Sequence, residues 1–319
     1  MAARVQVVIV NWNGEEYLAA CLRAVAAQDH DGPLDVLVVD NGSTDGSLAL
    51  LARDFPQVEV LRSARNNYTA ANNLGVARSK GPHALLLNTD AVIEPAAVRL
   101  LVAALEADSR AAAAAPLITY PDGRICTTGI VERDDLRWVD RDQGKRLRAF
   151  GGTERVWGVS GCCVLVRTDA WREVGGQDEA FHMYYEDVDL ALRWQQRGWH
   201  CLFVPAARCV HEGHGSIRKA TVWKDELGER NRLMVLARSR PECFLRELAD
   251  SPWIHSAPRE QVEALLPLLA QRFRADAGQG LAEIRAALAT ARRPRWSLRR
   301  RMRKVREALA ARFPDRFGW

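Results

Sequence analysis

The sequence predicts an α/β protein with a mostly parallel central sheet flanked by helices, followed by a helical C-terminal extension. In the first half of the chain, short β-branched runs alternate with segments of helical spacing, which is typical of parallel sheets covered by helices. From Thr221 onward the pattern is helical, with breaks near Pro241, Pro252, Pro258 and Pro294.

The predicted elements follow one another regularly up to residue 107. Continuous apolar runs predict strands buried on both faces at Val5–Val10, Leu34–Val39, Val58–Leu61 and His83–Leu87. Helical spacing predicts helices at Glu15–Gln28, Leu48–Phe55, Ala70–Ala77 and Pro95–Ala107.

The alternation loosens beyond Pro116. We expect strands at Cys162–Val166 and Cys201–Val204, a short helix at Trp171–Gly176, and a helix from Glu186 to Gly198. The run Ala111–Ala115 reads as low complexity and is assigned to no element. The predicted organisation is a catalytic domain over 1–218, a helical extension over 219–290, and a terminal helix over 291–319.

Composition excludes several classes of protein. The 319 residues are 48% hydrophobic and 27% charged, the balance of a globular protein rather than a disordered or collagen-like one. No apolar run approaches the roughly 18 residues of a membrane span. The seven cysteines include no CxxC pair, which argues against a disulfide framework and a zinc site. We therefore expect a cytoplasmic, reduced protein.

Charge is concentrated at the C-terminus. Residues 291–319 hold 11 of the 45 Lys and Arg but only Glu307 and Asp315 of the 40 acidic residues, which leaves 34 basic and 38 acidic residues elsewhere. Leu298, Met302, Val305, Leu309 and Phe313 form an apolar stripe on this segment. The pattern predicts a helix lying on an anionic membrane surface, or one packed on the body; nucleic-acid binding is disfavoured by the acidic body.

Polar residues follow three of the predicted strands directly. Asn11-Trp12-Asn13 comes after the first strand, Asp40 after the second and Asp90 after the fourth. Because ligands bind at the carboxyl ends of parallel strands, this edge is a candidate site. Helix capping explains Ser43–Asp45 but not Asp40, which suits a ribose hydroxyl or a base N–H. Asp90 suits Mg²⁺, although loop solvation explains it equally well.

Two further groups could carry chemistry. Glu186, Asp187 and Asp189 open a helix, where acidic residues favour the helix dipole; burial beside Met183–Tyr185 would instead suit one of them to general-base work. His211 and His214 flank glycines, which suits a metal ligand or a solvated loop. GxSxG, GxGxxG and GxxxxGK[ST] motifs are absent from the sequence.

Nine segments in order resemble the inverting, nucleotide-sugar-dependent glycosyltransferases of family 2, which have a GT-A fold. They are Val7–Gly14, Val38–Ser47, Asn72–Gly75, Leu85–Asp90, Trp157–Gly161, Val174–Gly176, Tyr185–Arg193, His211–Ser216 and Glu229–Leu233. Together they cover roughly residues 4 to 240. The chain is most similar to the rhamnosyltransferase-like branch, which builds bacterial cell-wall and surface polysaccharides.

The resemblance implies roles on the donor side. Asn11, Asn13 and Asp40 would line the nucleotide pocket, with Asn66 and Asn73 nearby. Asp90 matches the last aspartate of the family's DxD motif and would bind Mg²⁺ or Mn²⁺, together with His211. The first position of that motif is Asn88, a departure that would weaken the affinity for the metal.

The resemblance also implies the acceptor side and the reaction. Asp187 matches the catalytic base, Glu186 would orient the acceptor, and Trp157, Ser160 and Gly161 would line the acceptor side. Asp187 would then deprotonate an acceptor hydroxyl that attacks the anomeric carbon in one displacement. Residues 195–199 do not satisfy the QxxRW motif of processive members, which predicts transfer of one or a few sugars.

The pattern around Asp40 favours dTDP or UDP over GDP as the nucleotide. The basic C-terminal segment fits a saccharide or polyprenyl-linked acceptor presented at the inner membrane face. Two alternatives remain open. A nucleotidyltransferase would need a basic, glycine-rich loop after the first strand, where this chain has Asn11–Gly14 without Arg or Lys. A non-catalytic sugar-binding module would not need Asp90, Asp187 and His211 together.

Overall fold

The computed structural model describes residues 2–212 and 221–291. Contacts divide the chain into two compact units, Met1–Arg218 and Lys219–Trp319. His214 and, apart from Ala291, the predicted basic helix over 291–319 lie outside the described residues.

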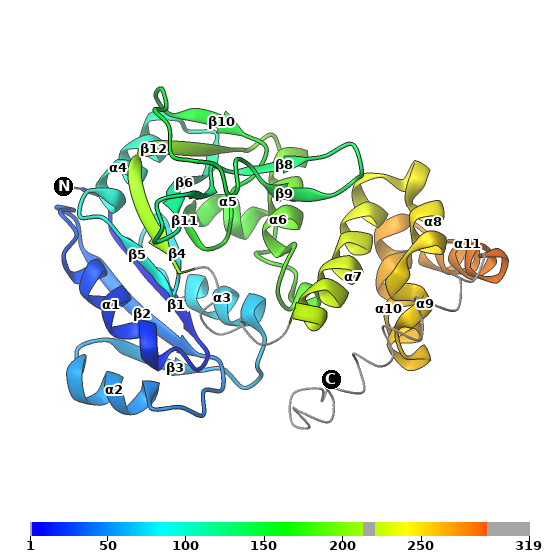
Figure 1. The fold of residues 1–319 in the computed structure, drawn as a ribbon, viewed down its shortest axis with the longest axis horizontal. Coiled ribbons are helices and arrows are strands. Elements are labelled where there is room, and N and C mark those ends of the chain that lie inside the picture. The colour runs from blue at the N-terminus through cyan, green and yellow to red at the C-terminus, as the bar shows by residue number, and fades with distance from the viewer. Residues whose placement is uncertain (1, 213–220, 292–319) are drawn as a thin grey trace. The chain divides into compact units, whose positions relative to one another are not determined.

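The first unit is built on one large sheet. Its main strands are β1 (Val5–Asn11), β2 (Leu34–Asp40), β3 (Glu59–Arg62), β4 (His83–Asn88), β6 (Ala111–Thr119), β10 (Glu154–Val156), β11 (Cys163–Arg167) and β12 (His200–His211). They lie in the order β10-β12-β6-β11-β4-β1-β2-β3 (Figure 1). Strands β4, β1, β2 and β3 are parallel, and β12 is parallel to β6, whereas β11 is antiparallel to both of its neighbours. The sheet is mixed but mostly parallel, which confirms the predicted fold class.

Helices cover both faces of this sheet. One face packs against α1 (Glu15–Ala26), α2 (Ser47–Asp54) and α4 (Ala97–Ala107). The other packs against α3 (Tyr68–Ala77), α5 (Thr168–Glu173) and α6 (Glu186–Gln196). Along β1, Val7 and Ile9 belong to the first core, and Val8 and Val10 to the second. Because both faces are buried, the strand is apolar without alternation.

The alanine run is a central strand, which the sequence did not predict. Ala111–Ala115 are 0–5% exposed and open β6, which lies between β11 and β12. Alanine is depleted in strands, so propensity argued against this assignment. Burial between neighbouring strands and beneath α4 outweighs that preference here.

Strand β12 is longer than predicted and carries a histidine to the site. The prediction ended at Val204, but after an irregularity before Arg208 the strand continues to His211. There it pairs with a short strand, β5 (Ala91–Ile93), so that His211 stands opposite Ala91. This pairing brings His211 beside Asp90.

Short strands between 125 and 156 were also not predicted. Strand β7 (Ile125–Thr127) pairs with β6, and β8 (Ile130–Glu132) and β9 (Trp138–Asp140) form a separate hairpin. An isolated bridge joins Ile130 to Gly158. A 3-10 turn, η1 (Glu179–Phe181), precedes α6.

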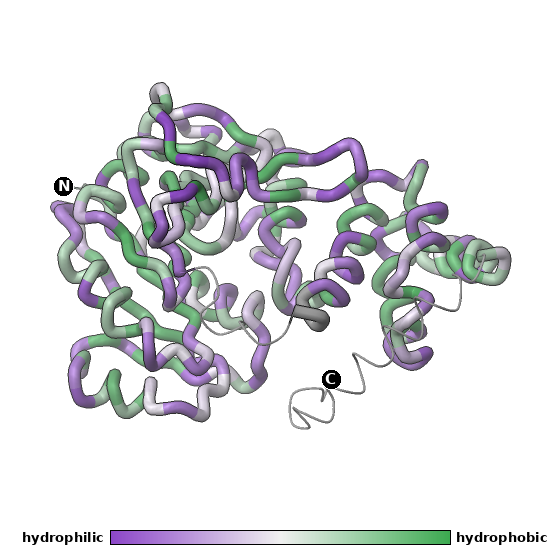
Figure 2. Tube along the Cα trace, viewed as in Figure 1, coloured by the Kyte–Doolittle hydropathy of each residue, from purple (hydrophilic) through white to green (hydrophobic). Residues whose placement is uncertain are grey.

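The second unit is helical, as predicted. Its described helices are α7 (Thr221–Ser239), α8 (Pro241–Asp250), α9 (Pro252–Ser256), α10 (Arg259–Phe273) and α11 (Ala277–Thr290). Pro241 and Pro252 each stand in the first turn of a helix, where proline is tolerated. Green and purple alternate along these helices, as expected for amphipathic helices packed on one another (Figure 2). Among the described helices, none is long and apolar enough to cross a membrane.

A buried ion pair explains one of the sequence motifs in this unit. The Arg232 guanidinium donates to both carboxylate oxygens of Glu229, at 3.0 and 2.8 Å, and also to Glu247 of α8 at 3.1 Å. Arg232 is 4% exposed. The segment Glu229–Leu233 therefore joins α7 to α8.

Candidate active site

The carboxyl ends of β1, β2 and β4 meet at one edge of the sheet. Asn11 stands opposite Asp40, and Val10 stands opposite Asn88. Polar side chains from separate parts of the sequence therefore lie at neighbouring strand ends, the position at which parallel α/β sheets bind ligands.

Asn11 is the buried centre of the polar cluster at the ends of β1 and β2. Its Nδ2 donates to Ser43 Oγ and Ser47 Oγ, both at 2.9 Å, and lies 3.4 Å from Asp40 Oδ1. Its Oδ1 is buried without a partner among the described residues. A buried acceptor without a donor costs about 1–3 kcal/mol, so this atom is a candidate ligand contact. Asp40 is 3% exposed beside it.

Asn13 joins the loop after β1 to the loop after β2. Its backbone lies in the left-handed region, with φ of 52°. Its N–H donates to Ser43 Oγ at 3.0 Å, and its Oδ1 accepts from the Thr44 N–H at 2.7 Å. Asn13 therefore fixes the shape of the loop that follows Asp40.

The two remaining asparagines predicted for the nucleotide pocket lie in different settings. Asn66 is exposed, and its Oδ1 accepts from Asn41 directly after Asp40. Asn73 donates to the Gln177 carbonyl at 2.8 Å and accepts from the Gln177 N–H at 2.9 Å. Both polar atoms of Asn73 thus bind backbone, a structural role that the sequence did not indicate; its predicted contact with the nucleotide stays a prediction.

Tyr68 links the end of β4 to the helix that carries the acidic residues. Its hydroxyl lies 3.0 Å from Asn88 Oδ1 and 3.3 Å from the Gly161 carbonyl oxygen. The Gly161 N–H in turn donates to Asp187 Oδ2 at 3.2 Å. Tyr68 and Gly161 therefore connect the end of β4 to the start of α6.

Asp90 and His211 form a pair that suits a divalent cation. Asp90 Oδ1 lies 3.2 Å from His211 Nε2, and the side chains are 11% and 16% exposed. Adjacent ligands of one octahedral ion at about 2.1 Å would stand roughly 3 Å apart, so both can bind one Mg²⁺ or Mn²⁺. Among the described residues no group of three or more His, Cys, Asp or Glu could hold a metal, so the remaining ligands would come from a bound diphosphate.

A cysteine thiol lies on the other side of the histidine ring. Cys126 Sγ is 3.6 Å from His211 Nδ1, and Cys126 is buried. A partner on one ring nitrogen fixes the orientation in which the other nitrogen faces a metal. No sequence pattern predicts this contact.

Asp187 lies in the first turn of α6. Its Oδ1 accepts from the Val188 N–H at 2.8 Å, and its Oδ2 accepts from Gly161. Burial, and then the Asp140 carboxylate of β9, raise the pKa of Asp187 from 3.8 to about 6, against the opposing effect of these N–H groups. A carboxylate with a pKa near 6 is ionised at pH 7 and still basic enough to accept a proton.

Glu186 is the buried neighbour of Asp187. Burial, and then Asp187, raise the pKa of Glu186 from 4.5 to about 8. Its Oε2 is buried without a partner among the described residues. An added Cβ at Gly161 would lie 3.5 Å from Glu186 Oε1 and 3.8 Å from the Tyr68 hydroxyl, so Gly161 leaves these two groups uncovered. Glu186 is therefore a neutral acid at pH 7, able to donate a hydrogen bond.

Asp189 has a different role from Asp187. It is fully buried, and its Oδ2 accepts from Arg193 Nε at 2.7 Å, one turn along α6. Arg193 also donates to the Val174 carbonyl at 2.7 Å. Asp189 therefore anchors α6 to the segment after α5.

The backbone before α6 is strained. His182, Tyr184 and Tyr185 have φ values of 64°, 67° and 65°, in the left-handed region that large side chains rarely adopt. Each such residue costs on the order of 1–3 kcal/mol, and such strain clusters at functional sites. Here the strained turn leads directly into Glu186 and Asp187.

An aromatic cluster lies beside these acids. The Trp138 ring centroid is 5.9 Å from that of Trp157 and 6.4 Å from that of Tyr185. Trp157 also accepts a hydrogen bond from Gln195 of α6 at its carbonyl, and Ser160 Oγ accepts one from the Cys162 N–H at 3.4 Å. Trp157, Ser160 and Gly161 thus lie on the segment leading into β11, next to α6.

Sequence reasoning missed Tyr68, Trp138 and Asp140. Tyr68 precedes the predicted start of its helix, because Asn67 caps α3 by accepting from the Ala70 N–H at 3.1 Å. Trp138 and Asp140 lie on a strand of three residues, too short to show periodicity. The aromatic residue at 138 was the one available signal.

The family model described as glycosyltransferase like family 2 matches residues 3–234. The chain belongs to this family. The match spans the whole described sheet and the start of α7, including every residue of the site described above.

Relatives of known name support this assignment. The chain is 32% identical over 208 residues to the N-acetylglucosaminyl-diphospho-decaprenol L-rhamnosyltransferase of Mycobacterium tuberculosis, covering 56% of this chain and 66% of the relative. It is 26% identical over 227 residues to an O-antigen biosynthesis protein of Myxococcus xanthus, covering 67% of this chain and 18% of the relative. The chain thus spans 66% or less of the length of these two relatives.

Solved structures show the GT-A fold predicted for the chain. GalNAc-T7 with UDP, GalNAc and Mn²⁺ superposes with a TM-score of 0.62 at 19% identity, covering 92% of this chain and 58% of the other. A mannosyltransferase from Pyrobaculum calidifontis in complex with GDP-Man and Mn²⁺ gives 0.51 at 18% identity, covering 98% and 82%. At these identities the likeness shows the fold.

Proposed function

We propose that this family 2 glycosyltransferase inverts the anomeric centre as it moves a sugar from a nucleoside-diphosphate sugar to an acceptor hydroxyl. The observation that carries this proposal is the connection through Gly161. Its N–H binds the Asp187 carboxylate, and its carbonyl contacts Tyr68, which reaches Asn88 at the end of β4. A base at the start of α6, joined through Gly161 to the strand end that carries Asn88, supports direct transfer between two bound substrates.

Asp187 acts as the general base in this proposal. With a pKa raised to about 6 it is ionised at neutral pH and accepts the proton of the acceptor hydroxyl. The N–H groups of Gly161 and Val188 orient its carboxylate. In this mechanism no side chain attacks the sugar, so a single displacement inverts the configuration of its anomeric carbon.

Glu186 acts as a neutral hydrogen-bond donor to the acceptor. Its buried Oε2 has no partner among the described residues, and burial keeps it protonated below about pH 8. Trp157, Ser160 and Gly161 complete the acceptor side, with Trp138 behind Trp157. Aromatic rings provide apolar area for the faces of a sugar while the acids bind its hydroxyl groups.

The donor binds along the ends of β1, β2 and β4. Asn11 Oδ1 and Asp40 accept hydrogen bonds from a base or ribose, which favours the imide N–H of a thymine or uracil nucleotide. Asn13 and Asn66 hold the loops around Asp40. Asp90 and His211 would hold the Mg²⁺ or Mn²⁺ ion, which when bound would neutralise charge on the diphosphate leaving group.

We propose a saccharide linked to a polyprenyl diphosphate as the acceptor, in cell-wall or surface polysaccharide assembly. Support comes from the relatives, one named as acting on N-acetylglucosaminyl-diphospho-decaprenol and one as an O-antigen biosynthesis protein. A panel of nucleoside diphosphates and nucleotide sugars, with and without Mn²⁺, identifies the donor by thermal shift. A ligand that binds only the folded state raises the free energy of unfolding by RT ln(1 + [L]/Kd), so at equal concentration the tightest binder gives the largest shift.

Substitution Asp187→Asn tests the proposed activity. It removes the base but keeps the shape of the side chain, so we expect kcat for transfer to fall about 1,000-fold. Donor affinity, measured by calorimetry, should stay within about threefold of wild type because the base does not bind the nucleotide. Asp169→Asn, on an aspartate that is 83% exposed at its side chain, is the matched control. Transfer by Asp187→Asn at the control's rate would contradict the proposal, and donor binding without transfer or hydrolysis by wild type would indicate a binding module.

A further inference from the structure

One exposed leucine lies in a strongly basic loop. Leu147 is 49% exposed, the most exposed of the three large hydrophobic residues that stand out at the described surface; the other two are Val60 and Val92. Those two lie in the short strands β3 and β5. Leu147 instead lies between Arg146 and Arg148, two residues after Lys145. Residues 143–149 are all exposed, and we call them the basic loop.

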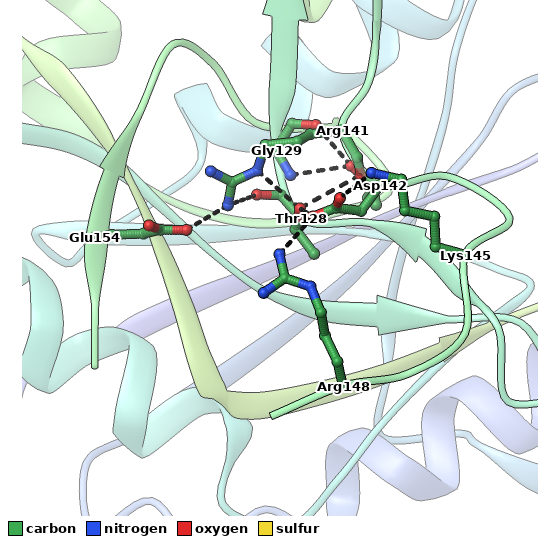
Figure 3. Close-up of polar contacts among 8 residues, drawn as sticks. Thr128, Gly129, Arg141, Asp142, Lys145, Arg148 and Glu154 are labelled. Carbon is green, nitrogen blue, oxygen red and sulfur yellow. Dashed lines mark hydrogen bonds and ion pairs between the residues drawn. The ribbon is translucent and has the colours of Figure 1, made fainter. Parts of the chain in front are cut away.

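Hydrogen bonds and ion pairs join the side chains at the base of the basic loop (Figure 3). The Asp142 carboxylate is 8% exposed and accepts from Thr128 Oγ1 at 3.0 Å, Lys145 Nζ at 2.8 Å and Arg148 at 3.3 Å. The Arg141 guanidinium donates to Thr128 Oγ1 and its carbonyl, both at 2.8 Å, and to Glu154. These contacts fix both ends of the loop.

Backbone bonds hold the middle of the basic loop against β7. Gly144 N–H donates to the Ile125 carbonyl at 2.8 Å, and Ile125 N–H donates to the Lys145 carbonyl at 2.9 Å. An isolated bridge joins Arg124 to Arg146. The chain is therefore ordered up to Arg146, and it presents Leu147 to solvent without packing it on the core.

The charge of this surface is positive. Between 141 and 150 there are four basic residues, Arg141, Lys145, Arg146 and Arg148, and a single acidic one, Asp142, a balance of +3. The Arg146 side chain forms no ion pair with any described residue. Arg148 stacks on Phe150 at 4.5 Å beside a depression of about 480 Å³, which Gly151, Gly152 and Thr153 also line.

The basic loop follows directly on the acceptor side of the site. Strand β9 ends at Asp140, whose carboxylate acts on Asp187, and begins at Trp138, which packs on Trp157. The Arg141 N–H donates to the Gly129 carbonyl at 2.7 Å, next to the residue that bridges to Gly158. A surface bound by the loop would therefore lie on the acceptor side.

We propose that the basic loop docks the enzyme on an anionic phospholipid bilayer, with Leu147 entering the interface and Lys145, Arg146 and Arg148 contacting lipid phosphates. The proposal rests on the proposed function, because a lipid-linked acceptor is the reason for the enzyme to bind a membrane. An apolar side chain among cations is the combination that binds anionic membrane surfaces. The adjacent depression with Arg148 offers room for a lipid headgroup.

Vesicle sedimentation of the full chain tests the docking. The probes are vesicles of phosphatidylcholine mixed with phosphatidylglycerol, and vesicles of phosphatidylcholine alone. We expect wild type to bind the anionic vesicles preferentially. Leu147→Ser should lower the partition coefficient about fivefold, and Arg146→Glu about tenfold, because the second reverses one charge near the surface. Because every variant keeps the C-terminal tail, the readout is the ratio of each variant to wild type.

Val60→Ser and Lys80→Glu are the matched controls, an exposed valine on β3 and an exposed lysine before β4. Both should bind as wild type does. Binding by Leu147→Ser and Arg146→Glu equal to the controls would overturn the proposal, as would equal binding of wild type to both kinds of vesicle or to neither. A partner protein would be the remaining occupant in those cases.

Catalysis separates this proposal from the proposed function. Hydrolysis of the nucleotide-sugar donor in solution should be unchanged in Leu147→Ser and Arg146→Glu, because neither residue lies in the site. Transfer to acceptor embedded in anionic vesicles should fall in step with the partition coefficient. Loss of vesicle binding with normal hydrolysis supports docking; absence of hydrolysis in wild type would instead count against the proposed function alone.

Discussion

Two adjacent carboxylic acids at the start of α6 differ in protonation at neutral pH. Asp187 has a pKa raised to about 6, and Glu186 a pKa raised to about 8, chiefly by burial in both cases. Asp187 accepts hydrogen bonds from two backbone N–H groups, which stabilise its charged form. Glu186 Oε2 has no such partner among the described residues. This difference supports the proposal that Asp187 serves as the base and Glu186 as a hydrogen-bond donor.

The rate of transfer should depend on pH through both acids. We expect kcat/KM to rise with pH through about 6, as Asp187 loses its proton, and to fall above about 8, as Glu186 loses its own. Because the two acids interact, the apparent pKa of each limb is a property of the pair. Initial rates at acceptor concentrations well below KM across this range check the profile, and a rate still rising at pH 9 would contradict the role given to Glu186.

Glu186→Gln should remove the alkaline limb, because the amide stays neutral and can still donate. It should also change stability. Between pH 4.5 and about 8 the folded protein holds a proton on Glu186 that the unfolded chain has released. Stability of wild type therefore falls as pH rises, by at most about 1.4 kcal/mol per unit from this group.

The free energy of unfolding of Glu186→Gln should thus exceed that of wild type by a margin that grows from pH 5 to pH 8. Urea denaturation at several pH values measures it. A difference independent of pH would show that Glu186 is already ionised in the folded protein.

At this scale the sequence indicated the acids better than the groups around them. Asp40 and Asp90 are predicted as site residues because each follows a buried strand, and Asp187 because its segment matches a motif of the family. Tyr68 and Asp140 influence the same site, but each reaches it through tertiary contacts from a distant segment. The spacing of apolar and polar residues along the chain does not reveal such contacts.

At the scale of elements, the turn between α5 and η1 shows how a predicted ligand contact can be structural. Gly176 has φ of 73°, and an added Cβ there would lie 2.5 Å from Asn73 Oδ1. The Asn73 amide binds the backbone N–H and carbonyl of Gln177, which is 3% exposed. The turn and α3 are therefore packed as one unit.

Asn73→Ala should lower stability without affecting the donor. It leaves a buried N–H and carbonyl of Gln177 unpaired, at a cost of about 1–3 kcal/mol in the free energy of unfolding. Urea denaturation measures the loss, and calorimetry with a nucleoside diphosphate should give a Kd within about twofold of wild type. A tenfold loss of affinity for the nucleotide with unchanged stability would instead show that Asn73 contacts the nucleotide.

Long elements with a clear apolar pattern were predicted, and short or atypical ones were not. Strands β1, β2 and β4 show unbroken apolar runs because helices bury both faces. Strand β6 opens with alanines, whose intrinsic preference is against strands, and β8 and β9 have three residues each. Trp138, next to Trp157 on the proposed acceptor side, comes from one of these missed strands, so its position could not be derived from the pattern.

At the scale of the whole molecule, the family model covers residues 3–234, and thus the sheet, the site and the start of the helical unit. The order of nine motifs predicted this family where composition alone predicted only a globular protein. The net charge of the whole chain is only +5, although it includes a basic C-terminal segment and the smaller basic loop over 143–149. Only the loop lies among the described residues.

The stereochemistry of the product tests the central claim most directly. Nuclear magnetic resonance of the first transferred sugar gives its anomeric configuration, to be compared with that of the nucleotide sugar consumed. With Asp187 activating the acceptor and no side chain attacking the sugar, we predict a product of inverted configuration. Retention of configuration would mean a covalent or internal-return mechanism, and would contradict a single displacement in which Asp187 activates the acceptor.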